Sequence, residues 1–231
     1  NCSKKDTSTT ENKDDYSKVA PVDTTGAVFG DWIIQRELAD PQSLNPVTLQ
    51  DATGREFSIH VFERLMWAAG REDYELVPWL AEAAPEETPD HLTYTYKIKK
   101  NVTFSTGKPL TGKDVVFTFK AMMNPQVDAA QSRQAIDMLK NVELVNGDEY
   151  TVRFTLSRPY FKAIYALSDI QIMSKDAADP EHLTDKYTFE ECKDISTAQK
   201  NPVMKKFADH FNSQEANRDP KNLIGSGPYI F

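Results

Sequence analysis

Alternating apolar and polar residues in the middle of the chain have the period of a β-strand. Residues 92–98 alternate in this way, which would place one apolar row on one face of an extended strand. A polar interruption at residues 99–101 is followed by Val102 and Phe104, which resume the alternation. The pattern therefore predicts a β-hairpin over residues 92–104.

A helix is predicted directly after this hairpin. Thr111 and Asp114 have the spacing of a capping box, in which the two side chains bind free backbone amides of the first helical turn. Gly112 in that turn weakens a helix by up to ~1 kcal/mol relative to alanine. Apolar residues then recur at helical spacing and predict one apolar helix face: Val115, Phe119 and Met122. Pro125 ends the pattern.

A second hairpin is predicted around Asn146 and Gly147. Both residues tolerate a positive φ, which a two-residue hairpin turn requires. Val142 and Leu144 alternate with polar residues before the turn, and residues 150–156 alternate after it. This is the most clearly defined local prediction in the sequence.

Weaker patterns predict the remaining elements. Residues 31–38 are expected to form the first strand, and residues 57–67 form an amphipathic pattern typical of a helix. Residues 175–200 show no clear pattern beyond a short helix at 189–192. The other predictions are a helix over 129–139 with Ile136 and Leu139 inward, a helix opened by Pro159 with Phe161, Ile164 and Tyr165 inward, a strand over 170–174, and a helix opened by Pro202 with Met204, Phe207 and Phe211 on one face.

Composition and charge narrow the function classes. The chain has 231 residues, of which 39% are hydrophobic and 27% charged, as in ordinary soluble globular proteins. Its net charge of -8 argues against a nucleic-acid partner, because such binding depends on Lys and Arg neutralising phosphates. No apolar run reaches the ~20 residues that a membrane-spanning helix needs.

The sequence contains no motif typical of an enzyme. The four histidines are scattered, and no zinc-type His pair, nucleophile elbow or phosphate-binding glycine loop is present. Cys2 and Cys192 are far apart and form no Cys-x-x-Cys motif. We therefore expect no catalytic residue, no metal and no cofactor.

Residues 1–28 are mostly Thr, Ser, Asp, Lys and Asn. Such a segment buries too little apolar surface to offset the entropy of ordering, so a disordered tether is predicted. Cys2 stands at its head. Its plainest interpretation is an exposed free thiol.

The central segment contains Tyr94-Thr95-Tyr96, Val102, Phe104, Gly107, Pro109-Leu110-Thr111 and Asp114-Val115-Val116-Phe117. In order and spacing these residues resemble the signature of the extracellular solute-binding proteins of family 5, which deliver peptides, and less often nickel or sugars, to ABC importers. Asn101 and Gly112 depart from the family pattern, where Gly and a small Ala or Ser are usual. Residues 225–229, Gly-Ser-Gly-Pro-Tyr, resemble a later family loop that enters a strand beside the ligand cleft.

The resemblance implies a mixed α/β fold, the N-terminal part of a two-lobe, type II periplasmic binding protein. On this basis residues 29–49 and 168–231 belong to the first lobe. Residues 50–167 form a small, hairpin-rich domain inserted into it. Because family members continue into a second lobe, the chain is expected to be an N-terminal portion of such a protein.

The resemblance also implies a function and a site. Two lobes would close around an extended oligopeptide, and ABC permease subunits would receive it. Asp40 and Gln42, in the loop of residues 39–46, and Ser226 and Gly227 are the candidate ligand contacts, with Asp40 pairing with the peptide's amino terminus. A lipidated Cys2 would anchor a monomeric protein to a membrane, in the periplasm or at the cell surface.

Two other readings remain open at this level. The loop of residues 39–46, including Ser43, could use its polar groups only to cap its own turns. The whole chain could also be a non-transport surface lipoprotein, an interaction module that keeps the fold without a ligand. A hydrolase has no support, since no nucleophile is paired with a base.

Overall fold

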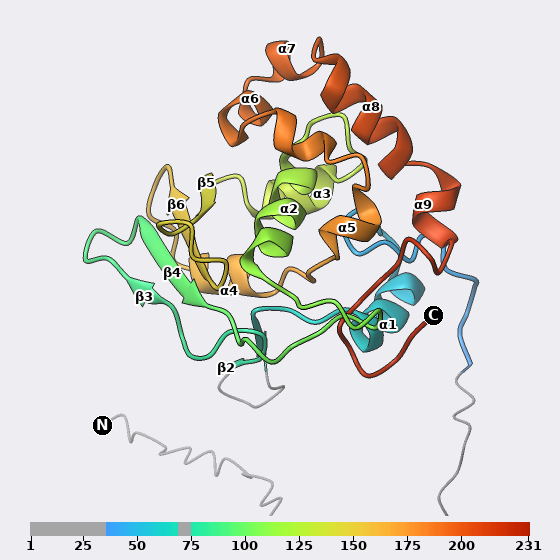
Figure 1. Ribbon diagram of the computed structural model, residues 1–231, viewed down its shortest axis with the longest axis horizontal. Helices are drawn as coiled ribbons and strands as arrows, with labels where there is room; N and C mark the ends of the chain where they lie inside the picture. Colours follow the sequence, from blue (N-terminus) through green and yellow to red (C-terminus); the bar gives the residue numbers. More distant parts are fainter. Residues whose placement is uncertain (1–35, 69–74) are drawn as a thin grey trace, which may run out of the picture. The chain divides into compact units, whose positions relative to one another are not determined.

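The computed structural model describes residues 36–68 and 75–231 (Figure 1). Residues 37–231 form one compact unit, and the expected boundaries at 49/50 and 167/168 stay predictions. The predicted tether of residues 1–28, with Cys2, lies outside the described residues. The same holds for most of the predicted strand 31–38, and its described part, residues 36–38, is not a strand.

A four-stranded antiparallel sheet forms one part of this unit. Its strands lie in the order β3-β4-β6-β5. A separate antiparallel pair joins β1 and β2, in the register Trp67 to Val77. The strands are β1 (Met66–Ala68), β2 (Leu76–Pro78), β3 (Glu86–Glu87), β4 (Thr93–Lys97), β5 (Leu139–Leu144) and β6 (Thr151–Leu156).

The predicted hairpin around Asn146 and Gly147 is confirmed. These two residues have φ angles of 52° and 75°, so both occupy the left-handed region that the tight turn needs. Val142 of β5 lies opposite Phe154 of β6. The apolar alternation thus sets the register, as expected when one sheet face is buried.

The predicted hairpin over residues 92–104 is wrong. β4 pairs instead with β3 and with β6, whose sequence lies more than fifty residues further on. Residues 102–104 fold back on residues 108–110: the Leu110 amide donates to the Val102 carbonyl at 3.0 Å, and Gly107 supplies the turn with a φ of 81°. Alternation identifies a strand, but it does not identify the strand's partner.

Helix α2 (Gly112–Met123) begins with the predicted capping box. The Thr111 amide donates to the Asp114 carboxylate at 2.9 Å, and the Lys113 amide donates to the Thr111 hydroxyl at 3.2 Å. The helix ends at the cap residue Asn124. Its start and end are therefore local properties of the sequence, and both were predictable.

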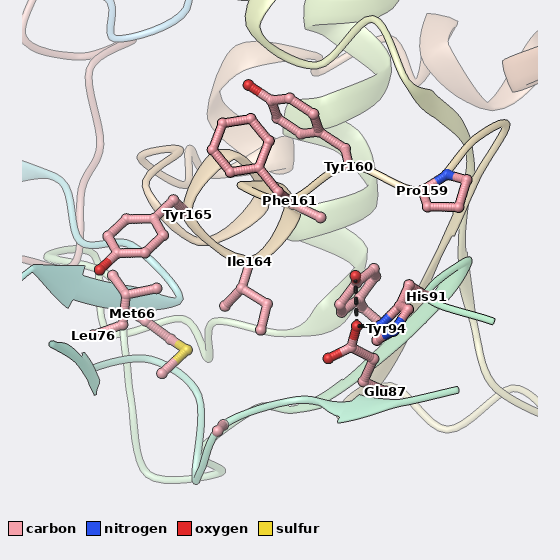
Figure 2. Close-up of a pocket in the computed structure, with 12 residues that line it drawn as sticks. Met66, Leu76, Glu87, His91, Tyr94, Pro159, Tyr160, Phe161, Ile164 and Tyr165 are labelled. Atoms are coloured by element: carbon pink, nitrogen blue, oxygen red, sulfur yellow. Dashed lines mark hydrogen bonds and ion pairs between the residues drawn. The ribbon is translucent and has the colours of Figure 1, made fainter. Parts of the chain in front are cut away.

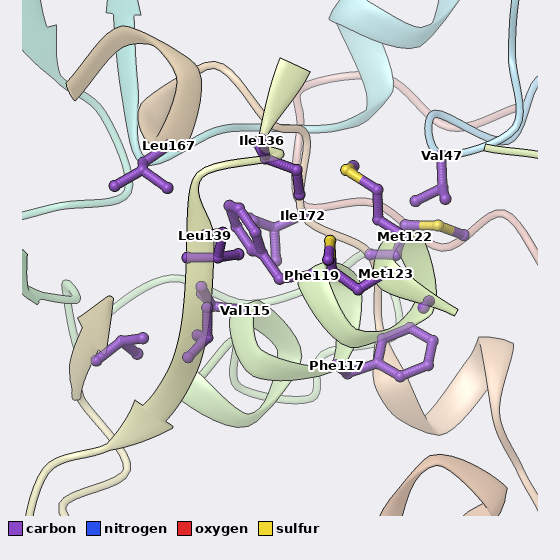
Figure 3. Packing of buried hydrophobic residues seen from close by; sticks show 14 of the residues in the cluster. Val47, Val115, Phe117, Phe119, Met122, Met123, Ile136, Leu139, Leu167 and Ile172 are labelled. Carbon is purple, nitrogen blue, oxygen red and sulfur yellow. The ribbon is translucent and has the colours of Figure 1, made fainter. Parts of the chain in front are cut away.

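The prediction of a single apolar face on α2 is too narrow, because α2 is buried on two sides (Figure 3). Toward the sheet, the Phe119 ring lies edge-on to Phe154 with centroids 4.9 Å apart. On the other side, Phe117 meets Phe207 of α8 at 6.1 Å. α2 therefore joins the sheet to the later helices.

Close packing explains why residue 112 is a glycine, a reason that the sequence did not reveal. A Cβ at this position would lie 2.6 Å from Cγ2 of Val152, 2.7 Å from Cδ2 of Leu144 and 2.9 Å from the Glu149 carbonyl oxygen. The Gly112 amide also donates to that carbonyl at 2.7 Å. Glycine lets the first turn of α2 approach the β5–β6 hairpin.

We expect Gly112→Ala to destabilise the protein by about 1–2 kcal/mol, because overpacking outweighs the ~1 kcal/mol that alanine gains in helix propensity. Urea denaturation would measure this change. Lys113→Ala, which changes an exposed side chain of the same turn, is the control and should alter stability by less than about 1 kcal/mol. A more stable Gly112→Ala protein would contradict the packing argument.

Helix α1 (Ala52–Val61) replaces the predicted helix over 57–67. It starts earlier because Asp51 caps it, accepting from the Gly54 amide at 2.7 Å. It stops at Phe62, whose backbone is extended, and Met66 already belongs to β1. The apolar residues at four-residue spacing therefore do not belong to one helix, because they extend from α1 to the start of β1.

The remaining helices are short and lie mainly in the C-terminal half. They are α3 (Ala130–Ala135), α4 (Ala163–Ser168), α5 (Lys175–Ala178), the 3₁₀ helix η2 (Leu183–Lys186), α6 (Phe189–Lys193), α7 (Ile195–Ala198), α8 (Pro202–Phe211) and α9 (Gln214–Arg218). The predicted face of α8 is buried, as expected. Ile136 and Leu139 are buried too, but the predicted helix over 129–139 is too long, because α3 ends at Ala135 and Leu139 begins β5. The predicted strand at 170–174 is absent from the described residues: a single bridge joins Arg64 to Gln171.

Candidate functional site

The loop that carries Asp40 and Gln42 is held in place by groups distant in the sequence. Arg218, at the end of α9, donates to the Pro41 carbonyl at 2.8 Å and to the Gln42 carbonyl at 3.2 Å. The Gln42 amide donates to the Asp51 carboxylate at 3.3 Å. The backbone is thus fixed while the side chains of Asp40 and Gln42 stay exposed.

Ser43, by contrast, is used internally. Its hydroxyl donates to the side-chain oxygen of Asn217 at 3.0 Å, and Thr48 donates to the same oxygen. The Leu44 amide donates to the Asn217 carbonyl at 2.9 Å. Asn217 therefore anchors the loop, and no local pattern in the sequence linked residue 217 to it.

A polar cavity of about 390 Å³ lies beside this loop. Gln42 borders it, so the structure places this predicted residue at a hollow surface. Asp40 does not line it. The lining residues are Gln42, Ser43, Thr48, Gln50, Asp51, Asp128, Asn212, Gln214, Asn217 and Arg218.

The segment of residues 225–231 lies along the end of α1 (Figure 1). The Gly227 amide donates to the Val61 carbonyl at 2.8 Å, and the Tyr229 amide donates to the His60 carbonyl at 3.2 Å. Gly225 must be a glycine here, because a Cβ would overlap the Val61 backbone. The hydroxyl of Ser226 is buried and has no hydrogen-bond partner among the described residues.

The two predicted pairs of contact residues, Asp40 with Gln42 and Ser226 with Gly227, thus lie at opposite ends of α1. Gln42 reaches Asp51 at the start of the helix, and Gly227 reaches Val61 at its end. Ten helical residues span about 15 Å at 1.5 Å per residue. The two pairs are therefore not in contact, but they are joined by one rigid element.

A second cavity, of about 660 Å³, lies between the four-stranded sheet and the segment of residues 159–165 (Figure 2). Phe161 lines it with 89% of its surface exposed, and Tyr165 is 38% exposed, so the prediction that both face the core is wrong. Ile164 is partly buried against the core, as predicted. α4 starts only at Ala163, so residues 159–162 precede the helix and leave Phe161 uncovered.

Other site types find little support in the part of the chain that the structure describes. Within residues 36–68 and 75–231, no cluster of three His, Cys, Asp or Glu side chains could hold a metal ion. Cys192 is buried, and burial raises the pKa of its thiol to about 12, so it is a poor nucleophile. None of the described helices has the length and apolar character needed to cross a membrane.

The chain matches the family model described as bacterial extracellular solute-binding proteins, family 5 middle, over residues 75–231. Among curated relatives, Protein XP55 of Streptomyces lividans is 32% identical over 122 residues, which are 53% of this chain and 21% of that protein. The probable D,D-dipeptide-binding periplasmic protein DdpA of Escherichia coli K12 is 26% identical over 145 residues, 62% of this chain and 27% of that protein. The chain thus spans about a quarter of these relatives' length.

Solved structures share the fold. The oligopeptide-binding protein AppA from Bacillus subtilis, in complex with a nonapeptide, superposes with a TM-score of 0.58 at 26% identity. The match covers 83% of this chain and 32% of AppA. This similarity confirms the expected mixed α/β fold, which the chain shares with type II solute-binding proteins.

Proposed function

The chain belongs to the bacterial extracellular solute-binding proteins of family 5, and from this premise we propose that it takes part in capturing oligopeptides for an ABC importer. AppA, whose complex holds a nonapeptide, and DdpA, whose name describes a dipeptide-binding protein, support a peptide as the solute. The relatives are binding proteins, which agrees with a chain that does not catalyse a reaction.

The spacing of the two predicted pairs along α1 carries this proposal. A strand-like peptide advances about 3.3–3.6 Å per residue, so four or five of its residues span the ~15 Å helix. Asp40 at one end would pair with the amino terminus of such a peptide. At the other end, the Gly227 amide is already bonded to Val61 and the Ser226 hydroxyl is buried, so Ser226 and Gly227 would contribute their backbone carbonyls.

Asp40→Asn tests this assignment. We expect it to weaken the affinity for a pentapeptide with a free amino terminus about fivefold to tenfold, because a charge pair is lost while the shape of the side chain stays (1.4 kcal/mol per tenfold). Calorimetric titration would measure the dissociation constants. An acetylated pentapeptide should bind both proteins equally.

Asp209→Asn is the matched control, because Asp209 is an exposed carboxylate on α8 that pairs with Lys205 at 2.7 Å. Its peptide affinity should equal that of the unchanged protein. If the free and acetylated peptides bound the unchanged protein with equal affinity, Asp40 would not be part of the peptide site. Absence of any peptide binding would favour the interaction module instead.

We further propose that Cys2 carries the lipid anchor, and that the protein acts as a monomer outside the cytoplasm, docking on permease subunits. The polar composition of residues 1–28 supports a tether between an anchor and the folded unit. Two acyl chains on one cysteine would hold a protein on a membrane stably, whereas one chain gives only marginal binding.

Cys2→Ser is therefore expected to move the protein from the membrane fraction to the soluble fraction of its host cell. Immunoblotting after fractionation measures the distribution, and mass spectrometry measures the acyl groups. Cys192→Ala, which changes a buried thiol, should leave the distribution unchanged. A Cys2→Ser protein that stays in the membrane fraction would disprove the anchor.

A further inference from the structure

We propose that the cavity beside the four-stranded sheet is a binding site for an apolar primary amine, whose ammonium group is received by Glu87. None of the four residues proposed as peptide contacts lines this cavity. The inference therefore stands apart from the proposed import function. The ligand class follows from the apolar walls and from the position of one carboxylate.

The walls are apolar and come from separate elements. Met66 of β1 and Leu76 of β2 form one side, and Ile164 of α4 with Phe161 forms another (Figure 2). A volume of about 660 Å³ lies within the usual range of small-molecule sites, ~300–1,000 Å³. Covering the exposed Phe161 ring with a ligand's apolar part would remove apolar surface from water, at roughly 25 cal/mol per Å².

Glu87 is the acidic group at this cavity. It lies opposite Tyr94 in the β3–β4 register, and the Tyr94 hydroxyl donates to its Oε1 at 2.8 Å. Nδ1 of His91 contacts the same oxygen at 2.5 Å. Figure 2 shows the other carboxylate oxygen turned away from Tyr94, toward the side where Met66 and Ile164 lie.

These contacts keep Glu87 ionised. The hydrogen bond from His91, and then that from Tyr94, hold the pKa of Glu87 below its ordinary value. Burial and the neighbouring Glu87 raise the pKa of Tyr94 to about 12, so Tyr94 remains a neutral donor. With 31% of its side chain exposed, the carboxylate is accessible to a ligand.

The ionised carboxylate on the cavity wall favours a cationic ligand over an anionic one. The two cations beside lining rings, Lys162 at 5.6 Å from the Phe161 centroid and Arg158 at 6.0 Å from the Tyr160 centroid, are not lining residues themselves. Among the lining residues, Glu87 and His91 are the ionisable groups other than tyrosines. His91 already binds Oε1, which leaves Oε2 to accept from a ligand ammonium. A carboxylate ligand would instead meet a fixed negative charge beside an apolar wall.

The test uses three six-carbon probes of similar size: hexylamine, hexanol and hexanoate. Their dissociation constants would be measured by NMR, from the backbone amide shifts of Tyr94 and Ile164. We expect hexylamine to bind about tenfold more tightly than hexanol, and hexanoate to bind most weakly. Glu87→Gln should weaken hexylamine about fivefold or more and leave hexanol unchanged.

Glu86→Gln is the matched control, because Glu86 is the neighbouring residue of β3, is not among the residues lining the cavity, and pairs with Lys97 at 3.6 Å. It should leave all three affinities unchanged. Phe161→Ala, at an exposed position, should weaken hexylamine and hexanol alike. If Glu87→Gln fails to fold, the order of the three probes on the unchanged protein decides the question.

Three results would overturn the proposal. They are hexanoate binding as tightly as hexylamine, equal hexylamine affinity in Glu87→Gln and the unchanged protein, and probe-induced shifts that avoid the residues around the cavity.

Discussion

Asp114→Ala is expected to lower the free energy of unfolding by about 3 kcal/mol. Asp114 is 7% exposed, and its carboxylate accepts from the Thr111 amide at 2.9 Å, the Thr111 hydroxyl at 3.1 Å and the Lys175 amide at 2.9 Å. Alanine would leave these donors without a partner inside the fold. Each buried donor left unsatisfied costs about 1–3 kcal/mol.

Urea denaturation would measure this loss of stability. Two further variants serve as comparisons. Asp114→Asn keeps the shape and one acceptor oxygen, so it should cost less than Asp114→Ala. Asp176→Ala removes a half-exposed carboxylate that pairs with Lys108 and should cost less than about 1 kcal/mol. If Asp114→Ala were as stable as Asp176→Ala, the capping box would not stabilise α2.

The second large effect is expected from Gly225→Ala. The added Cβ would overlap the carbonyl of Val61 and lie 2.7 Å from its carbonyl carbon. Backbone atoms cannot rotate away as a side chain can, so residues 225–231 must leave the end of α1. Three backbone hydrogen bonds, from the amides of Ser105, Gly227 and Tyr229, would then be lost.

We expect a loss of about 3 kcal/mol, since each such bond contributes ~0.5–1.5 kcal/mol net. Hydrogen exchange would show it as faster exchange at Gly227 and Tyr229, with little change in the sheet. Ser226→Ala is the control next in the chain, and it should stay within about 0.5 kcal/mol, because its hydroxyl has no partner to lose. Unchanged exchange in Gly225→Ala would show that the segment does not depend on this close approach.

The features that were predictable from the sequence are local ones. The Asn146-Gly147 turn and the Thr111–Asp114 capping box each lie within a few residues, and both are confirmed. The partner of β4 was not predictable, because β6 follows only after α2 and α3. The burial of Phe117 likewise depends on α8, almost a hundred residues away.

The candidate site shows the same limit. Sequence resemblance singled out Gln42 and Gly227, but the residues that fix their loops are Arg218 and Val61. Nothing in the local sequence links residue 42 to residue 218. The Glu87 cavity was missed because its walls come from four separate stretches of chain, and because the predicted inward direction of Phe161 was wrong.

The two-sided burial of α2 has a consequence for biosynthesis. The chain emerges with its N-terminus first, so α2 appears before the aromatic residues of α8. Phe117 precedes Phe207 by 90 residues (207 minus 117), which corresponds to about 5–18 s at ~5–20 residues per second. During that interval the Phe117 side of the helix lacks its partner from α8, and apolar surface exposed in this way makes a nascent chain prone to aggregation.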